Sequence, residues 1–153
     1  MKKLLSIILV LCCVFAISGC GKNILYNAEI NSHANDIIEP VFLENNQVSF
    51  EGDPYPKTRT FVISDSETYN EIFTDSAEVI DFNSKIAVLH IFVDVYVNRD
   101  YHIEEMIETD GALEIHFEVE EKHGVGDASQ PFQRSLLIVM DKTGITNITM
   151  IKE

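Results

Sequence analysis

The alternation of apolar and polar side chains predicts a β-rich domain, and its clearest element is a strand over residues 86–97. One face of this strand is apolar throughout: Ala87, Leu89, Ile91, Val93, Val95 and Val97. The other face is largely apolar, with His90 and Asp94 as its polar members. Because both faces are apolar, we expect a central strand. Asp94 lies near the strand end, where we expect it to be exposed; a buried carboxylate there would instead be a candidate functional acid.

Two hairpins are expected after this strand. Residues 102–108 and 112–121 alternate in polarity around Asp110-Gly111. A two-residue turn would place Ile107 opposite Glu114, whereas a three-residue loop over residues 109–111 keeps most apolar side chains on one face and is preferred. A loop over residues 122–132 then leads to a second hairpin, which joins residues 134–141 to residues 145–151 with Gly144 in the left-handed conformation.

One principal helix is expected, from a cap at Asp65 or Ser66 to about Thr74. Tyr69, Ile72 and Phe73 then share one face, at the spacing of an amphipathic helix. Residues 40–50 are interpreted as one or two short strands, residues 52–56 as a loop and residues 58–63 as a further strand. Residues 40–153 are therefore predicted to form one α+β domain, a small antiparallel sheet of about six to eight strands with one principal short helix.

The N-terminal segment has the pattern of an export signal. Lys2 and Lys3 precede an uncharged apolar run over residues 4–18, which is short for a bilayer-spanning helix of about 20 residues. The run ends in Ile17-Ser18-Gly19-Cys20, which resembles a bacterial lipobox. We therefore predict a lipoprotein signal peptide over residues 1–19, a diacylglyceryl group on Cys20 and a polar tether over residues 20–39. The alternative is an ordinary signal peptide in which Cys20 has no role.

The cysteine positions favour the lipoprotein interpretation. The chain has 3 cysteines, at positions 12, 13 and 20. A protein processed before Cys20 would have no other thiol, and so no internal disulfide, cysteine–zinc site or cysteine nucleophile.

Charge and composition exclude several classes of protein. The chain has 11 Lys and Arg against 25 Asp and Glu, for a formal net charge of −14. Such a surface repels phosphate backbones and anionic lipids, so neither nucleic-acid binding nor membrane binding through basic patches is expected. The hydrophobic fraction of 46% is too high for a disordered acidic tail.

One group of side chains in the first hairpin could bind metal. The preferred register places His102 opposite Glu118 and Glu104 opposite His116, all on one polar face. Two imidazoles and two carboxylates could hold zinc or another divalent ion. The alternative is a solvated face of mutually compensating charges. No Gly-x-Ser-x-Gly or His-Glu-x-x-His motif occurs, and neither a catalytic residue nor a cofactor is expected.

From about Lys57 onward, the order of several short motifs resembles that of a known family. The motifs are Phe61-Val62-Ile63, a short helix with Tyr69 and Phe73, Asp81-Phe82-Asn83-Ser84-Lys85, Tyr101-His102-Ile103, Asp110-Gly111 and Gln130-Pro131-Phe132. This order is similar to that of the C-terminal domain of PrcB-like lipoproteins, which are accessory subunits of exported protease complexes. The family's Thr-Gly-Gly-Tyr turn is replaced here by Val97-Asn98-Arg99-Asp100-Tyr101. Residue usage also resembles that of small lipoproteins of low-GC Gram-positive bacteria.

These observations lead to an expected function. The protein is predicted to be anchored at the outer side of the cell membrane through an acylated Cys20, as a non-enzymatic binding or accessory module for an exported protease or another envelope protein. The alternative is a lipoprotein that senses a ligand or a divalent metal through the face formed by His102, Glu104, His116 and Glu118.

Overall fold

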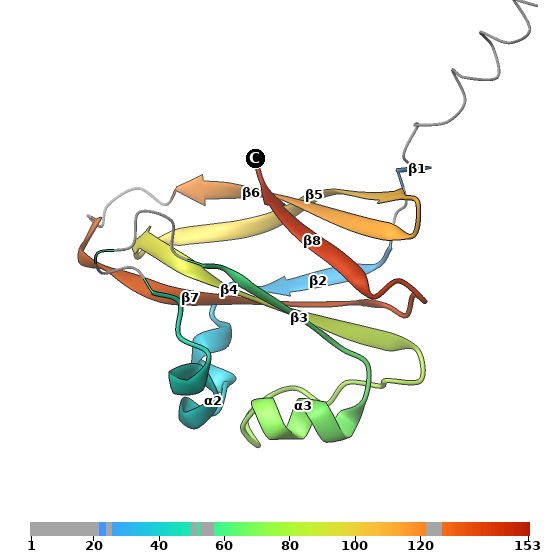
Figure 1. The fold of residues 1–153 in the computed structure, drawn as a ribbon, viewed down its shortest axis with the longest axis horizontal. Helices are drawn as coiled ribbons and strands as arrows, with labels where there is room; N and C mark the ends of the chain where they lie inside the picture. Colours follow the sequence, from blue (N-terminus) through green and yellow to red (C-terminus); the bar gives the residue numbers. More distant parts are fainter. Residues whose placement is uncertain (1–21, 24–25, 50–51, 53–56, 122–126) are drawn as a thin grey trace, which may run out of the picture.

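The structure is a computed structural model that describes residues 22–23, 26–49, 52, 57–121 and 127–153, and it contains two sheets packed face to face (Figure 1). Sheet A has the strand order β1 (Lys22–Asn23), β5 (Arg99–Thr109), β6 (Ala112–Glu121), β8 (Asn147–Lys152). Sheet B has the order β2 (Ala28–Asn31), β7 (Asp127–Asp141), β4 (Lys85–Tyr96), β3 (Arg59–Ile63). The 3-10 helix η1 (Ala34–Ile37) and the helices α2 (Pro40–Asn45) and α3 (Ser66–Ile72) lie on the other face of sheet B.

The predicted fold class is confirmed, because the chain is α+β, mostly β and mostly antiparallel, with one main helix. The strands divide between two sheets, and the pair β6 and β8 is parallel. No helix in the described part of the chain is long and apolar enough to cross a membrane.

Strand β4 is central, as predicted, and its two faces belong to two different cores. Val88 on one face packs between the sheets with Leu113, Ile115 and Ile138. Leu89 on the other face packs with the residues under the helices, including Ile63, Tyr69, Ile72 and Phe73. Each of these side chains is at most 5% exposed, so both faces of β4 exclude water. This burial explains why both faces of the strand are largely apolar.

Helix α3 begins where the sequence predicts. The Asp65 carboxylate accepts a hydrogen bond of 2.8 Å from the amide of Thr68, which is the contact of an N-cap. Tyr69 and Ile72 are buried within the helix, and Phe73 is buried directly after it. The helix therefore covers sheet B through the predicted face.

The first hairpin exists, but the predicted loop is wrong. Thr109 pairs with Ala112 across a two-residue turn, with φ of 51° at Asp110 and 79° at Gly111. Positive φ at both central positions gives a turn whose twist matches that of the strands. This turn places Ile107 opposite Glu114, so apolar and polar side chains face one another near the turn. A bulge between Ile103 and Glu105 shifts the register by one residue, and beyond it His102 pairs with Glu118 as predicted.

The prediction of a second hairpin is wrong. After β7 the chain crosses from sheet B to sheet A, where β8 pairs in parallel with β6, for example Leu113 with Ile148. Gly144 is not among the described residues with positive φ. Strand β7 begins at Asp127, so the predicted loop is shorter than residues 122–132, and residues 122–126 lie outside the described residues.

Two N-terminal predictions also need correction. Residues 40–45 form α2 instead of a strand, because Pro40 occupies the first helical turn, where its missing N–H has no cost. The predicted tether contributes β1, β2 and η1 to the fold, with Ala34 and Ile38 in the core. The signal segment, Cys20 and most of the loop at residues 52–56 lie outside the described residues.

Candidate functional site

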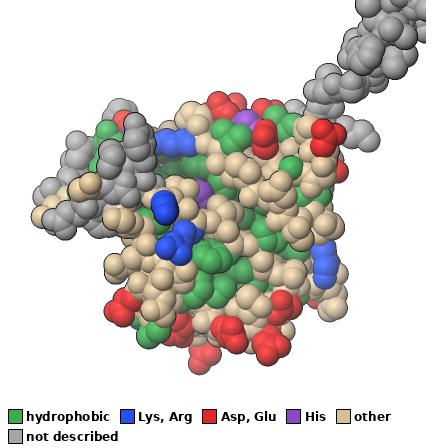
Figure 2. Space-filling view, viewed as in Figure 1, with side chains coloured by type: hydrophobic (Ala, Val, Ile, Leu, Met, Phe, Trp, Pro, Cys, Tyr) green, Lys and Arg blue, Asp and Glu red, His purple; other side chains and the backbone are tan. Residues whose placement is uncertain are grey.

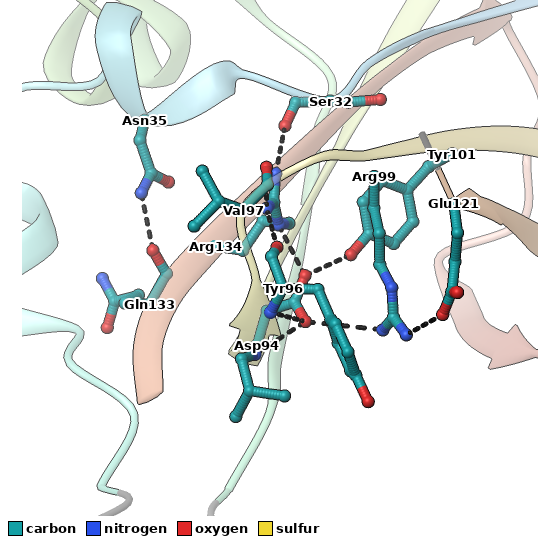
Figure 3. A network of polar contacts seen from close by, with 11 residues as sticks. Ser32, Asn35, Asp94, Tyr96, Val97, Arg99, Tyr101, Glu121, Gln133 and Arg134 are labelled. Carbon is teal, nitrogen blue, oxygen red and sulfur yellow. Dashed lines mark hydrogen bonds and ion pairs between the residues drawn. The ribbon is translucent and has the colours of Figure 1, made fainter. Parts of the chain in front are cut away.

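A cluster of three charged side chains and one tyrosine occupies one end of the core between the sheets (Figure 3). Asp94 comes from the end of β4, Arg99 and Tyr101 from the start of β5, and Arg134 from β7. Asp94 is 6% exposed, Arg134 5% and Tyr101 1%. We call these four residues the Asp94 cluster. The expectation that Asp94 lies exposed at the strand end is wrong.

Both carboxylate oxygens of Asp94 accept hydrogen bonds. Oδ2 accepts from the Tyr101 hydroxyl at 2.5 Å and from Arg134 Nε at 2.8 Å. Oδ1 accepts from the amides of Val95 and Tyr96 at 2.8 and 3.2 Å, and an Arg99 nitrogen lies 3.6 Å away. Burial alone would raise the pKa of this carboxyl, but the hydrogen bonds and the charge of Arg134 together lower it below its ordinary value.

The two arginines connect the carboxylate to other parts of the chain. The second terminal nitrogen of Arg134 donates to the carbonyls of Tyr96 and Val97 at 2.7 and 3.2 Å. Arg99 donates to Glu121 at 2.7 Å, and its guanidinium carbon lies 3.4 Å from the centre of the Tyr96 ring. The cluster therefore ties β4, β5, β6 and β7 together where the two sheets meet.

The groups of the cluster keep their protonation states near neutral pH. Burial and the hydrogen bond to Asp94 raise the pKa of Tyr101 well above its ordinary value. Tyr101 therefore stays a phenol and Asp94 a carboxylate near neutral pH, and the Tyr101 hydroxyl is already paired to Asp94. This arrangement favours rigid joining of strands over proton transfer to a substrate.

A pocket of about 260 Å³ adjoins the cluster, with Ser32, Asn35, Val97, Asn98, Phe132 and Arg134 on its wall. Asn35 donates from Nδ2 to the Gln133 carbonyl at 2.7 Å, which fixes the orientation of its amide. Its Oδ1 is buried and has no protein partner. One buried acceptor beside the pocket is therefore left without a protein partner.

The predicted metal ligands are not brought together. The bulge places Glu105 rather than Glu104 opposite His116, whose Nδ1 contacts Glu153 at 2.5 Å. His102 pairs with Glu118 along the strands, but its ring contacts Glu120 at 3.3 Å. No group of three or more His, Cys, Asp or Glu side chains in the described part of the chain is placed to hold a metal. The predicted four-residue site requires Glu104 opposite His116, and the bulge removes that pairing.

The sequence identifies one member of the Asp94 cluster: it predicts Asp94 as a possible functional acid, but not its partners Arg99, Tyr101 and Arg134. A charged side chain within an apolar strand is a signal of burial with a partner, and Arg134 heads the apolar run of β7.

Comparison of the chain with models of protein families, with curated proteins and with solved structures found no match.

The hydroxyl of Tyr101 provides a first test of the cluster. We expect Tyr101→Phe to lower the free energy of unfolding by about 1.5–3 kcal/mol, because its hydrogen bond goes to a charged acceptor. Tyr69→Phe is the matched control; its hydroxyl donates to the neutral Glu78 carbonyl, so a loss of about 0.5–1.5 kcal/mol is expected. Urea denaturation measures both values. An equal loss in the two variants would show that the Asp94 contact has no special role.

Proposed function

We propose that this protein is a lipid-anchored binding module on the outer face of the cell membrane, and that it acts as a non-enzymatic accessory to an exported protein. The lipobox-like Ile17-Ser18-Gly19-Cys20 supports the anchor. The resemblance to PrcB-like lipoproteins supports an exported protease as the partner.

The position of β1 is the observation that carries the proposal. Strand β1 begins at Lys22, two residues after the proposed lipid site at Cys20, and Lys22 pairs with Glu108. A lipid on Cys20 would therefore hold the end of sheet A that contains the Asp110-Gly111 turn close to the bilayer. The Asp94 cluster lies at the opposite end of β5, near Arg99, and would face away from the membrane. The domain would stand upright on a short connection.

The Asp94 cluster supports a binding role over a catalytic one. A general acid or base needs a proton that it can exchange with a substrate near the working pH. In the cluster, hydrogen bonds and the charge of Arg134 keep Asp94 ionised, and burial together with the hydrogen bond to Asp94 keeps Tyr101 protonated. These groups are better suited to keeping the far end of the domain rigid, as a binding surface requires.

Replacement of the proposed lipid site tests the anchor. In cells fed a labelled fatty acid, we expect the wild-type chain to be labelled and to sediment with membranes. Cys20→Ser should be unlabelled and released, because no thiol remains at the acceptor position. The matched control is the double variant Cys12→Ser/Cys13→Ser, which removes the other two thiols and should be labelled like the wild type. Labelling of Cys20→Ser would contradict the anchor.

Crosslinking on intact cells tests the accessory role. Lysine-directed crosslinks from the anchored protein should concentrate on one exported protein, and they should persist when that protein is expressed at its natural level. Crosslinks distributed over envelope proteins in proportion to their abundance would contradict a specific partner.

A further inference from the structure

Two free strand edges lie on the same side of the sandwich. Strand β3 pairs only with β4, and β8 pairs only with β6, so each ends its sheet among the described strands. The two strands contact one another across the space between the sheets. The face that they form is the one shown in Figure 2. Free edges present unpaired N–H and C=O groups, which can pair with another extended chain.

These two edges lack the charges that usually prevent such pairing. In β3, Arg59 is the first residue, and residues 60–63 are uncharged. In β8, Lys152 is the last residue, and residues 147–151 are uncharged. On the other side of the sandwich, β2 carries Glu29 within its four residues. The sequence thus leaves the β3 and β8 edges open in an otherwise strongly acidic chain.

A groove separates the two edges. It has a volume of about 460 Å³ and is lined by Thr60 and Val62 from β3, by Ser64 directly after β3, and by Ile145, Thr146 and Ile148 near the start of β8. No charged residue lies on its wall, whereas each of the four other pockets described has at least one carboxylate. In Figure 2, hydrophobic side chains gather across the middle of this face, while acidic ones lie at its upper and lower rims. The wall suits uncharged side chains that are apolar or carry a hydroxyl group.

We propose that the β3–β8 groove binds an extended, uncharged segment of a partner protein, which adds a strand to the edge of β3. Side chains alternate along a strand, so every second side chain of the segment would enter the groove while the backbone pairs with β3. Strand β3 has 5 residues, and the segment needs a comparable length. β-branched residues suit the segment, because they favour the extended conformation and most of the wall consists of threonine, valine and isoleucine.

Charge favours a different protein over a second copy of this chain. The formal net charge of −14 makes two copies repel one another, whereas a neutral or basic partner meets no such barrier. The inference deepens the proposed binding role, because it names the kind of partner. It does not depend on the anchor, so lipid labelling at Cys20 and binding at the groove can fail separately.

Selection from a random library of displayed twelve-residue peptides tests the groove, with the full chain in detergent as the target. The test variant is Ser64→Lys/Thr146→Lys, which places two charges at exposed positions of the wall. The matched control is Val41→Lys/Val79→Lys, which places the same charges at positions 65% and 95% exposed elsewhere. Urea denaturation of each variant confirms that it is folded.

We expect the wild type and the control to enrich peptides with consecutive uncharged, β-branched residues. A selected peptide should bind at least tenfold more weakly to Ser64→Lys/Thr146→Lys. It should slow amide exchange at residues 60–64 and should lose binding when alternate backbone nitrogens are methylated. Absence of enrichment, or binding that survives the groove variant, would overturn the proposal. A concentration-dependent dimer of the wild type that the groove variant abolishes would also overturn it, since a second copy would then occupy the groove.

Discussion

Replacement of Asp94 by alanine is expected to lower the free energy of unfolding by about 3–5 kcal/mol, because removal of one partner from a buried ion pair leaves the other charge without compensation. Arg134 is 5% exposed and would keep its charge in the core beside Arg99. The Tyr101 hydroxyl and the amides of Val95 and Tyr96 would also lose their acceptor. Such a loss is a large part of the total stability of a domain, about 5–15 kcal/mol.

The matched control for Asp94→Ala is Glu121→Ala, because both carboxylates contact Arg99. The Glu121 side chain is 69% exposed, so we expect its removal to cost about 1 kcal/mol or less. If Asp94→Ala does not fold, Asp94→Asn keeps the shape and part of the hydrogen bonding and gives a measurable transition. The double variant Asp94→Leu/Arg134→Met should lose less than the sum of its single changes, since it removes both charges. A loss below about 1 kcal/mol for Asp94→Ala would contradict a structural role of the cluster.

The free energy of unfolding is also expected to fall by about 3 kcal/mol as the pH drops from 6.5 to 4, because the unfolded chain protonates His90 more readily than the folded protein does. This side chain is 6% exposed, and burial lowers its pKa from 6.5 to about 4. Its Nδ1 lies 2.9 Å from the Thr60 hydroxyl, and its ring lies near those of Phe92 and Phe117. The unfolded chain takes up a proton first, because its histidine has the higher pKa. The stabilisation is therefore complete above pH 6.5 and is lost as the pH approaches 4.

Other groups with shifted pKa values contribute to the pH dependence of stability in different pH ranges. The pKa of Asp94 is below its ordinary value of 3.8, so its contribution is lost only at still lower pH. Hydrogen bonding to Glu153 raises the pKa of His116 above 6.5, so its contribution is lost as the pH rises through that higher value. The pKa values of Asp65, Asp81 and Asp141 are also lowered by hydrogen bonds, so their contributions, like that of Asp94, are lost below about 3.8. His90 is therefore the group whose shifted pKa acts mainly between pH 4 and 6.5.

Urea denaturation at several pH values from 7 to 4 measures the effect. His90→Gln keeps a polar group near Thr60 but cannot titrate, so its stability should change little over this range. His102→Gln, at a side chain 50% exposed, is the control and should keep the slope of the wild type. An unchanged slope in His90→Gln would show that the acid sensitivity has another source.

Elements with a strong local signal could be predicted from the sequence. Strand β4 has apolar residues on both faces, and α3 has the Asp65 cap together with an amphipathic face. The start of α2 resembles a strand in the sequence because Val41, Phe42 and Leu43 are also common in strands, although Pro40 is typical of the first turn of a helix. The dipeptide Asp110-Gly111 predicts the position of the turn but not its length. The bulge that reconciles the turn with the faces of β5 has no local signature.

The arrangement that creates the candidate site depends on contacts between distant residues. Arg134 lies 40 positions from Asp94, and the parallel pairing of β8 with β6 brings together residues from different parts of the chain. Neither contact produces a local pattern of apolar and polar positions. The sequence could therefore identify Asp94 as unusual, but it could not show which charges would surround it.

The pairing of β2 with β7 has a consequence for the order of folding. Ala28 pairs with Met140, although more than a hundred residues separate them. The N-terminal strand of sheet B cannot find its neighbour until nearly the whole chain is available, and closing so long a loop makes such pairings slow. Strands that are synthesised early remain unpaired until their partners are available, and their apolar faces stay exposed to water. We therefore expect productive folding of this domain to begin only after synthesis, or passage across a membrane, has reached its last two strands.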